Sequence, residues 1–258
     1  MKKEILVILT VFLVAGFTMA ALLKIGATPR PHAEILELIK PLAEAKGLEI
    51  KIIEFTDYVQ PNLALSEGEL DANFFQHKPY LDEFSQDRKL DLSSLVAVHV
   101  EPMGAYSKKV NSLKDLKKGA QVGIPNDPTN GGRALLLLQT AGLIEVNKKA
   151  GITPSVMDIV KNPHNLKFRE LEAAMLPRSL QDLDLAVINT NYALEGGLIP
   201  TKDALIMEGS ESPYANIVAV RTKDLKRPEF KILVELLTSK EVKDFLEKEY
   251  QGSIVAAF

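Results

Sequence analysis

The sequence predicts an α/β protein of two lobes, with two hinge crossovers and a ligand cleft between the lobes. Short β-rich runs alternate with amphipathic helical windows from residue 22 onward, which is typical of an α/β fold with largely parallel sheets. A long extended segment interrupts this alternation, and a second set begins at residue 112. The length of 258 residues agrees with one or two domains, because about 150 residues make one domain.

The spacing of apolar residues defines the first set of elements. Residues 31–46 carry isoleucine and leucine at helical spacing and end before Gly47, which suits the position after a helix. The other elements predicted here are strands at 22–27, 48–55 and 70–75, helices at 58–67 and 78–89, and an extended segment at 95–106.

The second set contains a well-marked helix at 128–141. The Asp127-Pro128 pair caps its start, and the apolar block 134–138 forms its centre. The other elements predicted here are a short helix at 112–118, strands at 121–125, 166–171, 185–188 and 217–221, and two consecutive helices within 228–249.

Two lobes must be joined by segments that cross between them. The best candidates for these crossovers are residues 98–106 and 212–221. The sequence therefore predicts one lobe at 21–103 plus 211–258 and the other at 104–210. A cleft between such lobes can close on a ligand by hinge bending.

The first 20 residues predict a signal for export. Two lysines follow Met1, residues 5–17 are apolar, and Thr18-Met19-Ala20 suits cleavage before Ala21. An uncleaved anchor is the alternative, because the uncharged stretch 5–23 is close to the roughly 20 residues that span a bilayer. Both interpretations place the folded part outside the cytoplasm, in the periplasm or another extracytoplasmic space.

Composition excludes several classes of function. Lysine and arginine number 31 against 34 acidic residues, for a net charge of −3, so no general attraction to a phosphate backbone is expected and nucleic acid is excluded as a partner. The chain has no cysteine. This excludes disulfides, thiolate nucleophiles, cysteine-bound zinc, iron–sulfur clusters and thioether lipidation.

The densest polar and aromatic cluster is the segment 71–80. It lies at the carboxyl end of the strand predicted at 70–75, where open α/β sheets place their ligands. Phe75 and His77 share one side of an extended chain, and Tyr80 lies one helical turn beyond His77. With Tyr58 they predict an aromatic box for a polarizable group such as a thioether. The alternative is that the rings are core and His77 is a hydrogen-bonded loop residue.

The segment 125–133 runs from a strand into a helix. The backbone N–H groups of the first helical turn predict an anion site, and Arg133 adds a two-pronged donor for a carboxylate. No Gly-Lys-Ser/Thr follows, so the segment is not a P-loop. A capped helix with a solvated arginine is the alternative.

Two asparagines complete the predicted site. Asn189 follows the strand at 185–188, and Asn216 lies in the second predicted crossover. Each residue can offer its side-chain carbonyl to an ammonium group. Each alone is also explained as a cap or turn residue. Together with the carboxylate clamp and the apolar box, they describe a zwitterionic amino acid with a soft hydrophobic side chain.

Catalytic alternatives have weaker support. The four histidines, at 32, 77, 99 and 164, show no metal-ligand spacing, and no hydrolase or zinc-protease motif is present. Asp71 and His77 form a candidate acid/base pair without a nucleophile beside them. A secreted hydrolase is therefore the weaker alternative, and we expect no enzyme, no cofactor and no metal. A ligand-sensing regulator conflicts with the export signal.

Six blocks of the chain closely resemble the methionine-binding lipoprotein family (MetQ/NlpA type), the substrate-binding components of methionine ABC importers. In order, the blocks are FTDYVQPN at 55–62, DANFFQHKPY at 71–80, GIPNDPTN at 123–130, LPRSL at 176–180, VINTNY at 187–192 and ESPYAN at 211–216. The resemblance implies a two-lobed fold similar to that of periplasmic binding proteins. It also implies an extracytoplasmic monomer that binds methionine and delivers it to a membrane ABC permease. Another small solute, such as a different amino acid or a methionine-containing dipeptide, is the alternative ligand.

The resemblance also implies a role for each predicted site residue. It places Tyr58, Phe75, His77 and Tyr80 around the methionine side chain. It assigns the carboxylate to Arg133 and the α-amino end to Asn189 and Asn216. One departure concerns the membrane anchor: family members usually carry a cysteine just after the signal, and this chain has none. We therefore expect a free protein, or one held by its N-terminal helix.

Overall fold

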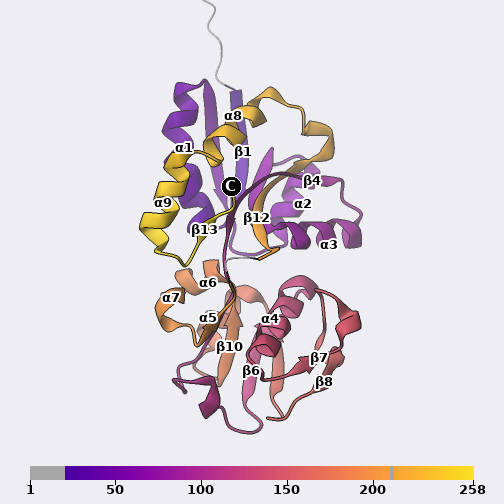
Figure 1. The fold of residues 1–258 in the computed structure, drawn as a ribbon. Coiled ribbons are helices and arrows are strands. Elements are labelled where there is room, and N and C mark those ends of the chain that lie inside the picture. The colour runs from indigo at the N-terminus through magenta and orange to yellow at the C-terminus, as the bar shows by residue number, and fades with distance from the viewer. Residues whose placement is uncertain (1–20, 210–211) are drawn as a thin grey trace, which may run out of the picture.

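Two β-sheets, one in each lobe, organise the computed structural model, which describes residues 21–209 and 212–258 (Figure 1). The lobes lie end to end and are joined by extended chain segments. The two-lobed α/β fold predicted from the sequence is confirmed. The predicted export segment, residues 1–20, lies outside the described residues.

The sheet of the first lobe has six strands in the order β13-β4-β12-β3-β1-β2. Their bounds are β1 Ala21–Ala27, β2 Leu48–Glu54, β3 Ala72–His77, β4 Leu92–Val100, β12 Ala215–Arg221 and β13 Val255–Ala256. Strand β1 pairs in parallel with β2 and β3, whereas β12 runs antiparallel to both β3 and β4.

The sheet of the second lobe has five strands in the order β11-β5-β10-β6-β9. Their bounds are β5 Gly104–Tyr106, β6 Gln121–Pro125, β9 Lys167–Leu171, β10 Leu185–Ile188 and β11 Ile206–Met207, with β7 Glu145–Val146 and β8 Ile159–Lys161 as a separate pair. Strand β6 is parallel to β9 and β10, and β5 is antiparallel to β10 and β11.

Both sheets are therefore mixed, and the prediction of largely parallel sheets is wrong. The reason lies in the crossovers. The parallel strands of each sheet end at the edge that faces the other lobe. A strand that enters directly from the other lobe, such as β5 or β12, begins at that edge and must run in the opposite direction.

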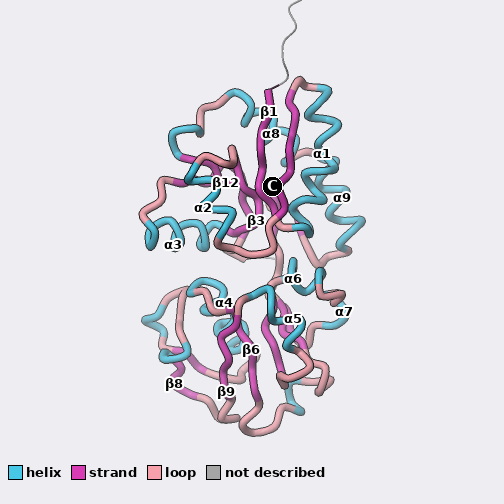
Figure 2. Tube along the Cα trace, turned by 180° about the vertical axis from the view of Figure 1, so that it is seen from behind, coloured by secondary structure: helices cyan, strands magenta, loops and turns pink. Residues whose placement is uncertain are grey.

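Helices cover the sheets on both sides (Figure 2). In the first lobe they are α1 Glu34–Ala45, α2 Gln60–Glu67, α3 Lys78–Arg88, α8 Pro228–Leu237 and α9 Lys240–Tyr250. In the second lobe they are α4 Pro128–Thr140, α5 Leu176–Ser179, α6 Thr190–Glu195 and α7 Pro200–Asp203. The apolar stripe of α1, with Ile35, Leu36 and Ile39 buried, packs with α8 and α9 against the first sheet. The largest core of the second lobe centres on α4 and the sheet behind it.

Several boundaries differ from the sequence prediction. The helix predicted at 58–67 begins at Gln60, because the Asp57 carboxylate accepts hydrogen bonds from the N–H groups of Val59 and Gln60 and holds the preceding turn. The strand predicted at 70–75 lies two residues later, at 72–77. The helix predicted at 112–118 is only one 3₁₀ turn, at Leu113–Asp115.

The chain crosses between lobes at residues 101–103 and again between β11, which ends at Met207, and β12, which begins at Ala215. The second crossover was predicted too late, at 212–221, because residues 215–221 are the central strand β12 of the first lobe. This strand starts at the interlobe edge, so its first residues lie beside the carboxyl end of β3.

Candidate functional site

A cavity lies between the lobes, and residues from both lobes line it. The lining residues are Tyr58, Phe75, Gln76, His77, Tyr80, Glu101, Asn130, Arg133, Asn189, Thr190, Asn191 and Asn216. All seven residues predicted from the sequence as ligand contacts are among them. The cavity lies where parallel strands of both sheets end, which is the position at which open α/β sheets bind ligands.

Aromatic rings form one wall of the cavity. The ring centroid of Tyr58 lies 5.9 Å from those of Phe75 and Tyr80, and the Phe75 and Tyr80 centroids are 6.1 Å apart. Tyr58 comes from the turn before α2 rather than from the helix itself. Tyr192, which the sequence analysis missed, extends this cluster into the second lobe at 4.9 Å from Tyr58. Such a wall of ring faces and edges suits a thioether.

His77 connects this wall to the second lobe. Its Nδ1 accepts a hydrogen bond from the backbone N–H of Tyr80 at 3.1 Å, so the neutral ring carries its proton on Nε2. Nε2 lies 3.1 Å from Oδ1 of Asn130 and donates to it. Burial, reinforced by Arg133, lowers the pKa of His77 to about 3, which keeps the ring neutral at pH 7.

Arg133 in α4 is buried, with 2% of its surface exposed. Its Nε donates to the carboxylate of Glu208 at 2.9 Å, and its Nη2 donates to the same group and to the backbone carbonyl of Glu101. None of the described residues accepts a hydrogen bond from Nη1. The guanidinium is therefore oriented by both crossovers and keeps one nitrogen for a ligand.

The start of α4 does not act as the anion site that the sequence predicted. The Asp127 carboxylate caps the helix and accepts from the backbone N–H and the side-chain amide of Asn130. An acidic cap already satisfies this helix end. The positive group available to a ligand anion is therefore Arg133 alone.

Asn189 presents a free acceptor. Its Nδ2 donates to Oδ1 of Asn130 at 2.8 Å, which fixes the orientation of the amide. Its Oδ1 is buried and has no hydrogen-bond partner among the described residues. Buried polar atoms are nearly always paired, so this oxygen is an acceptor available to a donor in the cavity. The position agrees with the carbonyl that we expected Asn189 to offer.

The side-chain amide of Asn216 is oriented opposite to that of Asn189, because its oxygen rather than its nitrogen is hydrogen-bonded within the protein. Asn216 is the second residue of β12 rather than part of a crossover, and its Oδ1 lies 3.2 Å from Nε2 of His32. Because Thr28 Oγ1 lies 2.7 Å from Nδ1 of His32 and Glu101 lies beside Nε2, the neutral His32 ring donates from Nε2. The Asn216 carbonyl is thus occupied, and its Nδ2 has no partner among the described residues. The expectation that Asn216 offers a carbonyl to an ammonium is wrong in this structure.

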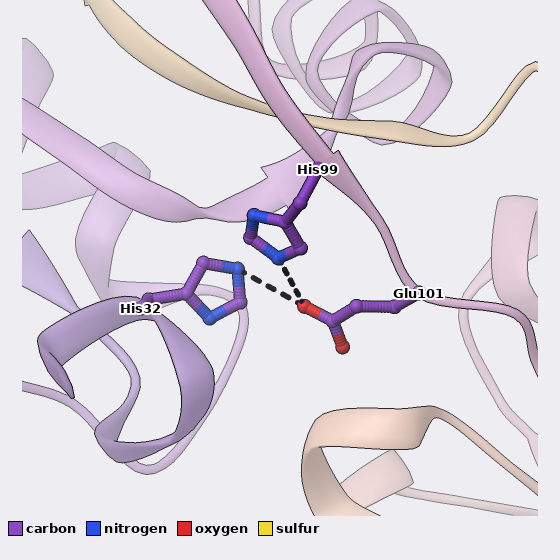
Figure 3. A group of neighbouring side chains, drawn as sticks. All are labelled: His32, His99 and Glu101. Atoms are coloured by element: carbon purple, nitrogen blue, oxygen red, sulfur yellow. Dashed lines mark hydrogen bonds and ion pairs between the residues drawn. The ribbon is translucent and has the colours of Figure 1, made fainter. Parts of the chain in front are cut away.

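Glu101 is an acidic group at the cavity that the sequence analysis missed. It belongs to the first crossover and has 5% of its surface exposed. Its Oε1 lies 2.8 Å from Nε2 of His99 and 3.3 Å from Nε2 of His32 (Figure 3). Its Oε2 accepts from the backbone N–H of Asn191 at 3.0 Å. Burial raises the pKa of Glu101, and His32 and Arg133 oppose that rise.

The cavity therefore combines two kinds of unsatisfied polar group. Glu101 and Oδ1 of Asn189 attract a cation with N–H donors. Nη1 of Arg133 and Nδ2 of Asn216 are donors for an anion, as is Nδ2 of Asn191, which is buried without a described partner. Together with the aromatic wall, this pattern fits a zwitterion that carries an apolar side chain.

The structure does not support the catalytic alternatives. Asp71 does not serve as the partner of His77, because its carboxylate pairs with Arg227 at 2.6 Å. Among the described residues that line the cavity, Thr190 is the one serine or threonine, and its hydroxyl donates to the carbonyl of Pro102 rather than to a base. His32, His99 and Glu101 are the one group among the described residues with three ligand atoms close enough for a metal, within 4.8 Å of one another.

Within residues 21–209 and 212–258, no helix has the length and apolar character to span a membrane.

Known proteins resemble the chain over nearly its whole length. The curated D-methionine-binding lipoprotein MetQ of Yersinia pestis is 46% identical over 236 residues, which cover 90% of this chain and 87% of that protein. A solved nutrient-binding protein from Burkholderia cenocepacia, bound to methionine, is 50% identical with a TM-score of 0.89 and covers 92% of this chain and 100% of its own. A periplasmic substrate-binding protein of an ABC transporter from Coxiella burnetii is 45% identical with a TM-score of 0.87, over 91% of this chain and 100% of its own.

The match to a family model is equally extensive. The model of the NlpA lipoprotein family covers residues 23–258, which include every residue that lines the cavity and both sheets except the first two residues of β1. On this match and on the identity to its relatives, the chain belongs to the NlpA lipoprotein family.

Proposed function

We propose that this protein binds free methionine in the interlobe cavity and delivers it to a membrane ABC importer, with no chemical step. The observation that carries the proposal is the buried, unpartnered Oδ1 of Asn189 in the same cavity as the free Nη1 of Arg133. One is an acceptor for an ammonium and the other a donor for a carboxylate. The relatives named for D-methionine binding and solved with methionine support the same ligand.

The ligand orientation follows from these groups. The α-ammonium lies between Oδ1 of Asn189 and the Glu101 carboxylate, and the α-carboxylate lies against Arg133 and Nδ2 of Asn216. This assignment reverses the role first expected for Asn216. The thioether lies against Tyr58, Phe75 and Tyr80, with His77 at the rim of the aromatic wall.

A secreted hydrolase is not supported, because the cavity holds no activated nucleophile.

The lobes that close on the ligand are proposed to be 21–103 plus 211–258 and 104–210, and the protein is proposed to act as a monomer outside the cytoplasm. Its relatives are called lipoproteins, but this chain contains no cysteine to carry a lipid. Any attachment to the membrane must therefore use another route.

The decisive experiment is calorimetric titration of protein that has been unfolded, dialysed and refolded to remove bound ligand. L-methionine, D-methionine, methionine-containing dipeptides and other amino acids are compared. We expect a methionine enantiomer to bind at micromolar or lower Kd, which corresponds to at least about 8 kcal/mol, and to be recovered chemically unchanged. Tighter binding of a different solute, or conversion of methionine to a product, would refute the proposal.

A further inference from the structure

Two buried histidines lie directly behind the cavity without lining it. His99, in β4, has none of its surface exposed, and His32, just before α1, has 1% exposed. Both aim Nε2 at the same oxygen of Glu101, at 2.8 Å for His99 and 3.3 Å for His32 (Figure 3). Burying an imidazole costs free energy unless its ring nitrogens form hydrogen bonds. The ligand contacts described above do not use either ring.

The hydrogen bonds define what the rings do to Glu101. Burial lowers the pKa of His32 to about 4 and of His99 to about 3, so both rings are neutral at pH 7. His99 donates its Nε2–H to Oε1, and the backbone N–H of Asn191 donates to Oε2. The Nε2–H of His32 donates to Oδ1 of Asn216, and the same nitrogen lies 3.3 Å from Oε1 of Glu101. The carboxylate thus receives two hydrogen bonds and the contact of the His32 ring, which together fix its position. None of these three groups carries a positive charge that would neutralise it.

Other charges do not replace the missing counter-ion. Arg133 is the cation beside the cavity, and its charge is paired with Glu208. Its contact with Glu101 goes to the backbone carbonyl rather than to the carboxylate. A negative charge at Glu101 therefore remains available to a cationic group in the cavity, at a position set by the two imidazoles.

We infer that His32 and His99 are positioning residues that hold the Glu101 carboxylate at the cavity wall and thereby make the site selective for ligands with a free, protonated amino group. This inference rests on the proposed function. It predicts that N-acylated or deaminated analogues are rejected because nothing then compensates Glu101. His32 also fixes the amide of Asn216, so its loss affects both ends of the ligand.

A metal ion held by the same three side chains is the competing explanation. Metal binding through Nε2 would move the proton of each ring to Nδ1. For His32 the Thr28 hydroxyl lies 2.7 Å away and can accept it. For His99 the Nδ1 atom is buried and has no partner among the described residues, so an N–H there would be left unsatisfied. The geometry therefore favours a donor role for His99.

The test compares two ligands on matched variants. His99→Leu removes the N–H donor, His99→Gln keeps an amide N–H near the same place, and His164→Leu is a control in the second lobe, far along the chain from the cluster. Each is titrated with methionine and with its deaminated analogue, 4-(methylthio)butanoate, by calorimetry and by competition at millimolar analogue. Thermal unfolding confirms that each variant is folded.

We expect His99→Leu to weaken methionine binding by about 10- to 100-fold, as for loss of a hydrogen bond to a charged group, and to change the affinity for the analogue by less than about twofold. His99→Gln is expected to restore most of the loss. In Glu101→Gln, where the charge is gone, adding His99→Leu should have no further effect on the ratio of the two affinities.

Equal weakening of both ligands by His99→Leu would overturn the inference, since it would indicate a merely structural role. Loss of methionine binding by the wild-type protein in EDTA, with recovery on adding Zn²⁺, would overturn it in favour of a metal. Failure of the wild-type protein to bind methionine at all would instead refute the proposed function, so the two failures are distinguishable.

Discussion

Arg133 of α4 is held by Glu208 of the second crossover, with Nε and Nη2 of the guanidinium against one carboxylate at 2.9 Å and 2.5 Å. Glu208 also accepts from the backbone N–H of Met103, in the first crossover. The residue proposed to bind the ligand carboxylate is therefore tied to both segments that join the lobes. Binding at Arg133 and the relative position of the lobes are physically connected through this ion pair.

This pair predicts a stability effect for Glu208→Gln. The change leaves the Arg133 charge buried without a counter-ion, and breaking a buried pair in this way costs about 3 kcal/mol or more. We expect the free energy of unfolding, measured in urea without ligand, to fall by about that amount. Glu235→Gln is the matched control, because its pair with Lys46 is exposed and worth at most about 1 kcal/mol. Equal effects of the two substitutions would contradict the account.

Arg133→Ala is expected to weaken methionine binding more than Tyr58→Ala. The first substitution leaves the ligand carboxylate without its cation, at a loss of about 1.5–3 kcal/mol or 10- to 100-fold in Kd. The second removes one ring of a wall that Phe75 and Tyr80 still form. Calorimetry on refolded protein measures both, with Arg169→Ala at an exposed site of β9 as the control. Near-normal affinity of the Arg133 variant would remove this residue from the site.

Several residues that line the cavity could be identified from the sequence, because their positions depend only on the strand or helix that contains or precedes them. Phe75 and His77 fall at the end of β3, Asn189 follows β10, and Arg133 lies in the helix after β6, so each position depends only on a strand and its end. Strand ends of an α/β sheet gather at one edge. That is why residues far apart in the chain could be assigned to one cavity.

The contacts that sequence could not predict depend on long-range register. His32 contacts Asn216 across 184 residues, and this contact holds the Asn216 amide in the orientation opposite to the one expected from the sequence. Spacing along the chain carries no signal for this contact. The contact of His99 with Glu101 is different, because the two residues lie two positions apart at the end of β4, where an extended chain turns both side chains to the same side. That contact was open to sequence reasoning, which did not consider Glu101.

Methionine affinity is expected to fall at acidic pH. Burial raises the pKa of Glu101, and the proposed α-ammonium binds its ionised form. As pH falls through this raised pKa, the free protein takes up a proton that must leave before ligand binds, so Kd increases. Calorimetry from pH 8 down to the lowest pH at which the protein stays folded measures the change, and Glu101→Gln should abolish this component. A Kd that is constant over this range in the wild-type protein would contradict the role of Glu101.

Buried histidines also predict that acid weakens the fold. Burial lowers the pKa of His32 to about 4 and of His77 and His99 to about 3, from 6.5. Below about pH 6.5 the unfolded chain binds protons that the folded protein excludes, so the free energy of unfolding falls by up to about 1.4 kcal/mol per pH unit for each ring, until the folded pKa is reached. The raised pKa of Glu101 offsets part of this loss.

Urea unfolding of the ligand-free protein at pH 7, 6 and 5 should show this decline in the free energy of unfolding. His99→Gln should reduce the slope of the decline with pH, whereas His164→Gln serves as the partly exposed control. A slope that His99→Gln leaves unchanged would show that His99 does not titrate as a buried neutral ring.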